Sequence, residues 1–225
     1  PYTTLFRSYE HFMIKEIHEQ PKAVRDTLNS IVKDGRIDLS AAGLDDESLR
    51  RVQSVHIVAC GSAWHVGMLA QYVFEDLANV PVRVELASEF RYRKMLLGEG
   101  TLVIVVSQSG ETADTRAALA LAKESGARVI AITNCVGSSV SREADVVLYT
   151  RAGPEIAVAS TKAYTTQLVC LYLLALKLGF LRGVLPQAEF SRLLAEIEAI
   201  PQKVGTIVAN QTEIQRFAAQ QWSVP

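Results

Sequence analysis

The sequence has few of the residues that stabilise small secreted or metal-dependent folds. Its three cysteines, Cys60, Cys135 and Cys170, are far apart, and its four histidines form no metal-ligand pattern with them. This spacing argues against a disulfide framework and against a metal site. We therefore expect a protein of the reducing cytoplasm that needs neither a metal nor another cofactor.

An excess of charge of either sign is also missing. The 225 residues carry a formal net charge of −1 and are 49% hydrophobic, so neither a nucleic acid nor an acidic membrane surface is an expected partner. The longest apolar run, Leu168 to Leu176, is too short to cross a bilayer, and the charged Lys177 follows it. This run predicts a helix buried in the core, and we expect no membrane partner.

The chain divides into four parts by its local composition. Residues 1–8 (PYTTLFRS) back-translate to the end of a common sequencing adapter, and we expect the protein itself to begin at about Tyr9. Residues 9–50 predict a helical lead-in of one or two amphipathic stretches, with Pro21 at a break or at a new first turn. Residues 51–185 predict the main domain, and residues 186–225 predict a connector of two helices, 188–200 and 203–220.

Five candidate strands alternate with helical patterns in the main domain. The predicted strands are 55–59, 82–85, 102–106, 129–132 and 146–149, and the predicted helices are 63–77, 88–97, 111–124, 138–143 and 163–178. This alternation predicts an α/β fold, a doubly wound five-stranded parallel sheet in the order 2-1-3-4-5 with flanking helices. In that order the first and third strands are neighbours, and ligands bind at their carboxyl ends.

Small polar turns follow both of these strands. Residues 60–63 (CGSA) follow the first strand, and residues 107–110 (SQSG) follow the third, with Thr112 just beyond. Hydroxyl groups, free backbone N–H groups and helix amino ends together suit a phosphate monoester, and Gly110 would let the backbone approach the anion. The alternative is that Ser109 or Gly110 merely caps the following helix. We favour a phosphate site because both turns fall at the crevice.

Other polar positions have structural interpretations. In the turn 153–162 (GPEIAVASTK), Ser160 or Thr161 is placed to cap the long apolar helix, and Lys162 would then be a solvated lysine. Glu89, Arg91 and Arg93, in the segment SEFRYRK, are interpreted as part of a salt-bridged surface rather than of a binding site.

Four segments together resemble one enzyme family. CGSAWHVGM (60–68), ELASEFRYRK (85–94), VIVVSQSGETADT (103–115) and EIAVASTKAYTTQL (155–168) resemble glutamine–fructose-6-phosphate aminotransferases, the glucosamine-6-phosphate synthases, in order and spacing. SQSGET by itself marks only the wider sugar isomerase (SIS) fold. The resemblance covers about Tyr9 to the end of the chain, and it implies the first SIS subdomain of the isomerase part of such a transferase.

The resemblance also implies roles for individual residues. The phosphate of the sugar would be held by Ser107, Gln108, Ser109 and Thr112, and the sugar itself would contact Gly61, Ser62, Val158, Ala159 and Ser160. Ala63 stands where the family often has a serine, and the lost hydrogen bond would weaken phosphate binding by about 1 kcal/mol.

The family converts fructose 6-phosphate and ammonia from glutamine to glucosamine 6-phosphate. Its ring-opening and proton-shuttling groups lie in a second SIS subdomain, and its glutaminase nucleophile lies in an amino-terminal domain of the same parent chain. The resemblance therefore implies no catalytic residue in this chain, no activity of the chain alone, and a homodimeric parent. Two alternatives are a stand-alone SIS isomerase of the arabinose 5-phosphate type and a non-enzymatic SIS sugar-phosphate sensor.

Overall fold

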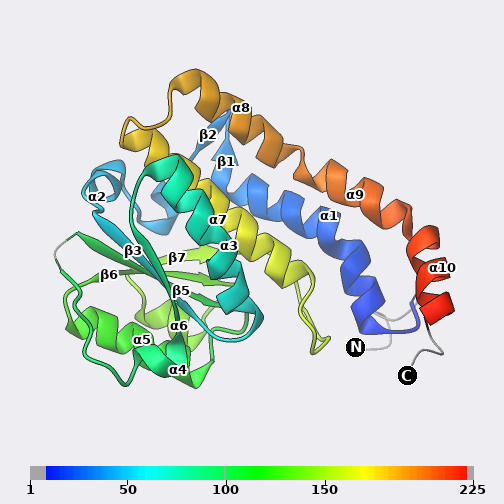
Figure 1. Cartoon of the computed structure of the whole chain (residues 1–225), viewed down its shortest axis with the longest axis horizontal. Helices are drawn as coiled ribbons and strands as arrows, with labels where there is room; N and C mark the ends of the chain where they lie inside the picture. The colour runs from blue at the N-terminus through cyan, green and yellow to red at the C-terminus, as the bar shows by residue number, and fades with distance from the viewer. Residues whose placement is uncertain (1–8, 99, 222–225) are drawn as a thin grey trace.

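One parallel sheet forms the centre of the computed structural model, which describes residues 9–98 and 100–221 (Figure 1). The predicted adapter-derived segment 1–8 lies outside these residues. The strands are β3 (Ser54–Ala59), β4 (Val82–Leu86), β5 (Thr101–Ser107), β6 (Arg128–Thr133) and β7 (Val146–Tyr149), and their order in the sheet is β4-β3-β5-β6-β7. All four pairings are parallel. The predicted 2-1-3-4-5 order is confirmed.

Helices cover both faces of this sheet (Figure 1). One face carries α3 (Ser62–Ala78) and α7 (Lys162–Leu181), and the other carries α4 (Ala87–Phe90), α5 (Ala113–Glu124) and α6 (Ser139–Glu143). In β5, Ile104 and Val106 enter the core beneath α3 and α7, whereas Val103 and Val105 enter the core beneath the other helices. Burial of both faces explains why the central strands β5 and β6 are continuous apolar runs. The edge strand β4 instead alternates, with an exposed Arg83 between two valines.

Helix α7 is the central helix of the larger core. Its length and composition would allow it to cross a membrane, but 61% of its apolar window is buried inside the fold, which confirms the predicted core helix. It packs so closely on α3 that a Cβ on Gly179 would lie 2.2 Å from the backbone oxygen of Leu77. Only glycine allows this contact between the two backbones.

The lead-in is a single helix, α1 (Phe12–Ile31), so the predicted break at Pro21 is wrong. Proline removes one backbone N–H from the helix and leaves the carbonyl four residues earlier without its donor. Here Nε2 of Gln20 donates to that carbonyl, of Ile17, at 3.3 Å. The segment after α1 consists of the hairpin β1 (Val32–Lys33) and β2 (Arg36–Ile37), the 3₁₀ turn η2 (Ser40–Ala42) and α2 (Asp46–Arg50).

Three other helices differ from their predicted lengths. The structure ends α4 at Phe90, well before residue 97, and begins α5 at Ala113 rather than at residue 111. The predicted helix 203–220 is two helices that meet at Asn210. The helices after α7 are α8 (Gln187–Glu198), α9 (Ile200–Ala209) and α10 (Gln211–Gln221). Helix α9 packs along α1, which therefore lies between α7 and α9 (Figure 1).

Candidate functional site

A cavity of about 220 Å³ opens at the carboxyl ends of β3 and β5. These strands are neighbours, and Ala59 near the end of one pairs with Val106 in the other. The cavity therefore occupies the crevice that the strand order favours for ligands. Its lining residues come from the end of β5, the first turn of α3, α7 and the turns between elements, and they are Cys60, Ser62, Ala63, Val106, Ser107, Gln108, Ser109, Thr112, Glu155, Ala157, Val158, Ser160 and Gln167.

The turn after β5 forms a group of hydroxyls on one wall. Oγ of Ser107 lies 3.1 Å from Oγ1 of Thr112 and accepts a hydrogen bond from the backbone N–H of Gly110 at 3.0 Å. Oγ of Ser109 accepts from the N–H of Glu111 at 3.2 Å. Glu111 precedes α5, and Thr112 at the N-cap position makes no side-chain cap bond. The serine hydroxyls therefore close a turn and do not cap the helix.

Gly110 is required by packing. Its φ is +66°, and a Cβ at this position would lie 2.1 Å from Oγ of Ser138, the N-cap residue of α6. A left-handed backbone and a close neighbour each favour glycine. The structure thus gives Gly110 a different reason from the expected approach of an anion, because the crowded side of this glycine faces α6.

Glu155 organises the turn before α7. Its Oε1 accepts from the backbone N–H groups of Thr161 at 2.9 Å and Ala163 at 3.1 Å, and its Oε2 accepts from Oγ of Ser160 at 3.0 Å. The expectation that Ser160 or Thr161 caps this helix is therefore wrong, because a carboxylate seven residues before the first helical residue does so. A negative charge at this end also suits the helix dipole.

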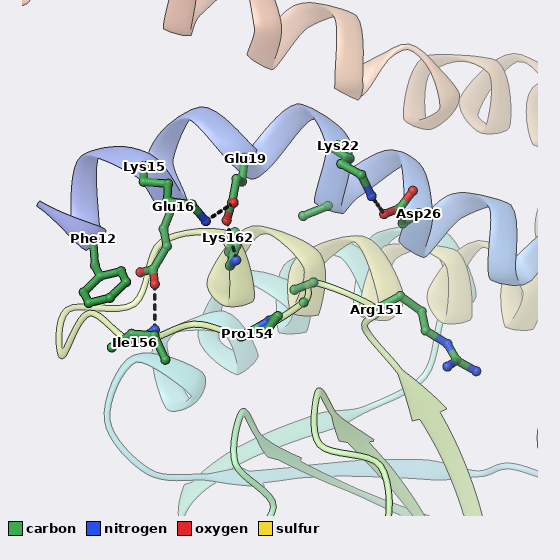
Figure 2. A pocket seen from close by; sticks show the side chains of 13 residues that line it. Phe12, Lys15, Glu16, Glu19, Lys22, Asp26, Arg151, Pro154, Ile156 and Lys162 are labelled. Carbon is green, nitrogen blue, oxygen red and sulfur yellow. Dashed lines mark hydrogen bonds and ion pairs between the residues drawn. The ribbon is translucent and has the colours of Figure 1, made fainter. Parts of the chain in front are cut away.

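Lys162 is buried and is not the solvated lysine that the sequence suggested. Its side chain is 2% exposed, and Nζ lies 2.6 Å from Oε2 of Glu19 on α1. Figure 2 shows this ion pair in a second pocket, of about 230 Å³, between α1 and the turn before α7. Burial alone would raise the pKa of Glu19, but hydrogen bonds from Lys15 and Lys162 outweigh it and lower that pKa. The lysine joins α1 to α7.

The arginines of the SEFRYRK segment form surface ion pairs. Arg91 binds Asp114 at 2.7 Å, and Arg93 binds Glu85. Neither arginine lines the cavity. The surface interpretation of these two residues is confirmed.

The structure brings together most of the residues expected at the site. Seven of the nine expected site residues line this cavity: Ser62, Ser107, Gln108, Ser109, Thr112, Val158 and Ser160. Gly61 and Ala159 lie beside them in the chain but do not line it. Ala63 also lines the cavity, so the hydroxyl that a serine would carry there is missing from its wall.

Gln167 is a cavity residue that the sequence interpretation missed. It lies on α7, is 2% exposed, and lines the cavity. The one local signal for Gln167 is that it is a polar side chain in a mainly apolar helix.

The polar groups of the cavity include hydroxyls, helix amino ends and the carboxylate of Glu155 rather than basic side chains. No lysine, arginine or histidine occurs among the described residues that line it. The first residues of α3 and the N-cap of α5 do line it, and helix amino ends carry partial positive charge and free N–H groups. Hydroxyls beside two helix amino ends are a suitable environment for a phosphate group.

Comparison with known proteins agrees with this geometry. The SIS domain family model matches residues 48–177. The chain is 54% identical over 217 residues to glutamine–fructose-6-phosphate aminotransferase (isomerizing) of Caldanaerobacter subterraneus, covering 96% of the chain and 36% of the relative. It is 52% identical over 212 residues to the enzyme of the same name from Clostridium acetobutylicum, covering 94% of the chain and 35% of the relative.

A solved structure gives the same picture. The C-terminal domain of glucosamine-fructose-6-phosphate aminotransferase from Francisella tularensis superimposes with a TM-score of 0.91 at 38% identity, covering 96% of this chain and 61% of that one. The chain thus spans about a third of the length of the curated relatives. Since the matched domain occupies more than half of its residues, the chain belongs to the SIS domain family.

Proposed function

We propose that this chain is the sugar-phosphate-binding half of the isomerase part of a glutamine–fructose-6-phosphate aminotransferase. The parent enzyme would make glucosamine 6-phosphate from fructose 6-phosphate and ammonia released from glutamine. The observation that carries the proposal is the cavity between β3 and β5, where hydroxyl groups from two turns meet two helix amino ends. Similarity to these aminotransferases along nearly the whole chain supports the choice of substrate.

The proposed binding mode follows the walls of the cavity. Ser107, Gln108, Ser109 and Thr112 would hold the phosphate, and Gly61, Ser62 and the 158–160 segment would contact the sugar. A phosphate monoester is doubly charged or nearly so at neutral pH, and each hydrogen bond to it is stronger than one between neutral groups. Binding would therefore depend mainly on the phosphate.

The chemistry of the parent would need groups beyond this chain. We propose that a second SIS subdomain supplies the isomerisation acid and base, that a glutaminase domain supplies ammonia, and that the cytoplasmic parent is a homodimer. In this division residues 9–50 lead into the SIS domain at 51–185, and residues 186–225 connect it to the second half. The described residues 9–35 form one helix and half of a hairpin, so they give no helix-turn-helix for the repressor-like alternative.

Calorimetric titration of this chain tests the proposal. Fructose 6-phosphate and glucosamine 6-phosphate should bind, whereas unphosphorylated fructose should bind far more weakly. Glutamine hydrolysis and isomerisation should both be undetectable. Equal affinity for fructose and fructose 6-phosphate would eliminate the hydroxyl turn as the main determinant, and isomerisation of arabinose 5-phosphate by the chain would instead favour a stand-alone isomerase.

A further inference from the structure

Glu16 on α1 reaches across to the turn that precedes α7. Its carboxylate Oε1 accepts a hydrogen bond from the backbone N–H of Ile156 at 2.6 Å, and Oε2 accepts from the N–H of Ala157 at 3.3 Å. Figure 2 shows this side chain pointing from the helix to the turn, across 140 residues of sequence. The contact joins the lead-in helix to the wall of the cavity.

The burial of this carboxylate is costly unless its hydrogen bonds are made. Glu16 is 1% exposed, and within the described ranges no lysine, arginine or histidine forms an ion pair with it. The neighbouring cations are used elsewhere, since Lys15 and Lys162 both pair with Glu19. A carboxylate buried without a cation depends on hydrogen bonds from its donors. Those donors are the two amides of the turn, so helix and turn hold each other in place.

The segment that Glu16 holds also lines the proposed sugar site. Ala157 donates to Glu16 and lines the cavity, and Val158, the next residue, lines it with a fully exposed side chain. Glu155, the carboxylate within the turn itself, accepts hydrogen bonds among the described residues from Ser160, Thr161 and Ala163, at the end of the turn. Glu16 therefore fixes the middle of the turn, and Glu155 fixes its end.

We propose that Glu16 is a positioning residue for the sugar, one that sets residues 156–158 against the cavity without touching the ligand. This inference rests on the proposed function, because it concerns the sugar end of the same site. The phosphate end is built on β5 and α5 and makes no contact with Glu16. Loss of the carboxylate should accordingly weaken recognition of the sugar and leave recognition of the phosphate intact.

The test compares two ligands in Glu16→Gln, which keeps the side-chain shape but removes the charge and one acceptor. Fructose 6-phosphate should bind about tenfold more weakly to the variant, the effect of losing well-placed hydrogen bonds. Inorganic phosphate, measured by its competition with fructose 6-phosphate in the same variant, should bind within about twofold of the unmodified chain. Asp26→Asn is the matched control, because Asp26 is on the same helix and, among the described residues, forms an ion pair only with Lys22. It should leave both affinities unchanged.

A second measurement needs no variant. In the unmodified chain, hydrogen exchange of the Ile156 and Ala157 amides should be slower than that of the Val158 and Ala159 amides. Fructose 6-phosphate should slow it further, and inorganic phosphate should not. If Glu16→Gln lowers the affinity for both ligands equally, Glu16 supports only the fold and the inference fails. The inference also fails if fructose 6-phosphate does not change the hydrogen-exchange rate of the Ile156 and Ala157 amides. If the unmodified chain binds neither ligand, the proposed function itself fails.

Discussion

The two hydroxyls of the turn after β5, on Ser109 and Thr112, separate a ligand site from a purely structural turn. Ser109→Ala removes one exposed bond, from the N–H of Glu111 at 3.2 Å, and such a bond contributes about 0.5 kcal/mol to stability, the low end for a hydrogen bond. Thr112→Val removes Oγ1, whose partner is Oγ of Ser107 at 3.1 Å. Because Thr112 makes no side-chain cap bond, α5 should lose little.

The effect on ligand binding should be larger than the effect on folding. A hydrogen bond to a charged group contributes about 1.5–3 kcal/mol, so each substitution should lower fructose 6-phosphate affinity at least about tenfold. Calorimetric titration gives the affinity, and thermal unfolding of the same samples gives the stability. Both are measured in the full-length parent enzyme as well as in this chain.

Ser125→Ala provides the matched control for this comparison. Ser125 follows the other end of α5, and its hydroxyl donates to the carbonyl of Leu121 at 2.9 Å, so it loses a local bond of similar kind far from the cavity. Its affinity for fructose 6-phosphate should match that of the unmodified chain. If the Ser109 and Thr112 variants melt at lower temperature while their affinity holds, the turn is structural and our assignment of the phosphate site is wrong.

Two further predictions concern stability. Gly110→Ala should lower the free energy of unfolding by about 2–4 kcal/mol, because the new Cβ adds left-handed strain and a close contact with Ser138. The control Gly43→Ala, with φ +77° and open space around it, should lower it by only about 1–2 kcal/mol. Urea unfolding measures both losses, and equal losses would show that the contact with Ser138 adds nothing. Glu19→Gln should lower the free energy of unfolding at neutral pH, and its difference from the unmodified chain should shrink as the pH falls below 4.5. The reason is that the fold stabilises the ionised form of Glu19, which is why its pKa is lowered. A difference that does not change with pH would contradict this.

The sheet and the hydroxyl turns could be predicted because their signals are local. The central strands β5 and β6 are buried on both faces and therefore appear as uninterrupted apolar runs, and the topology then places Ser62 and Ser109 at the same crevice. The hairpin of β1 and β2 also has a local sequence signal, because Asp-Gly is a favoured two-residue hairpin turn. In the structure Asp34 and Gly35 both have the positive φ that this turn requires.

The contacts of α1 could not be predicted because their partners are remote in sequence. Glu16 and Glu19 look like ordinary polar positions of an amphipathic helix, and Lys162 looks like a solvated residue at a helix start. Their burial depends on the packing of α1 against α7, a tertiary fact with no local pattern. The predicted break at Pro21 was wrong because the side chain of the neighbouring Gln20 supplies the hydrogen-bond donor that proline lacks.

The walls of the cavity differ in how they are held, and this difference bears on specificity. The turn after β5 continues directly from a buried strand of the sheet, so the proposed phosphate end should be stiff. The turn before α7 is held instead by side chains, Glu155 from within and Glu16 from α1. A site built in this way would bind the common part of all sugar phosphates with its rigid wall. Its choice among sugars would then depend on a turn whose position α1 controls.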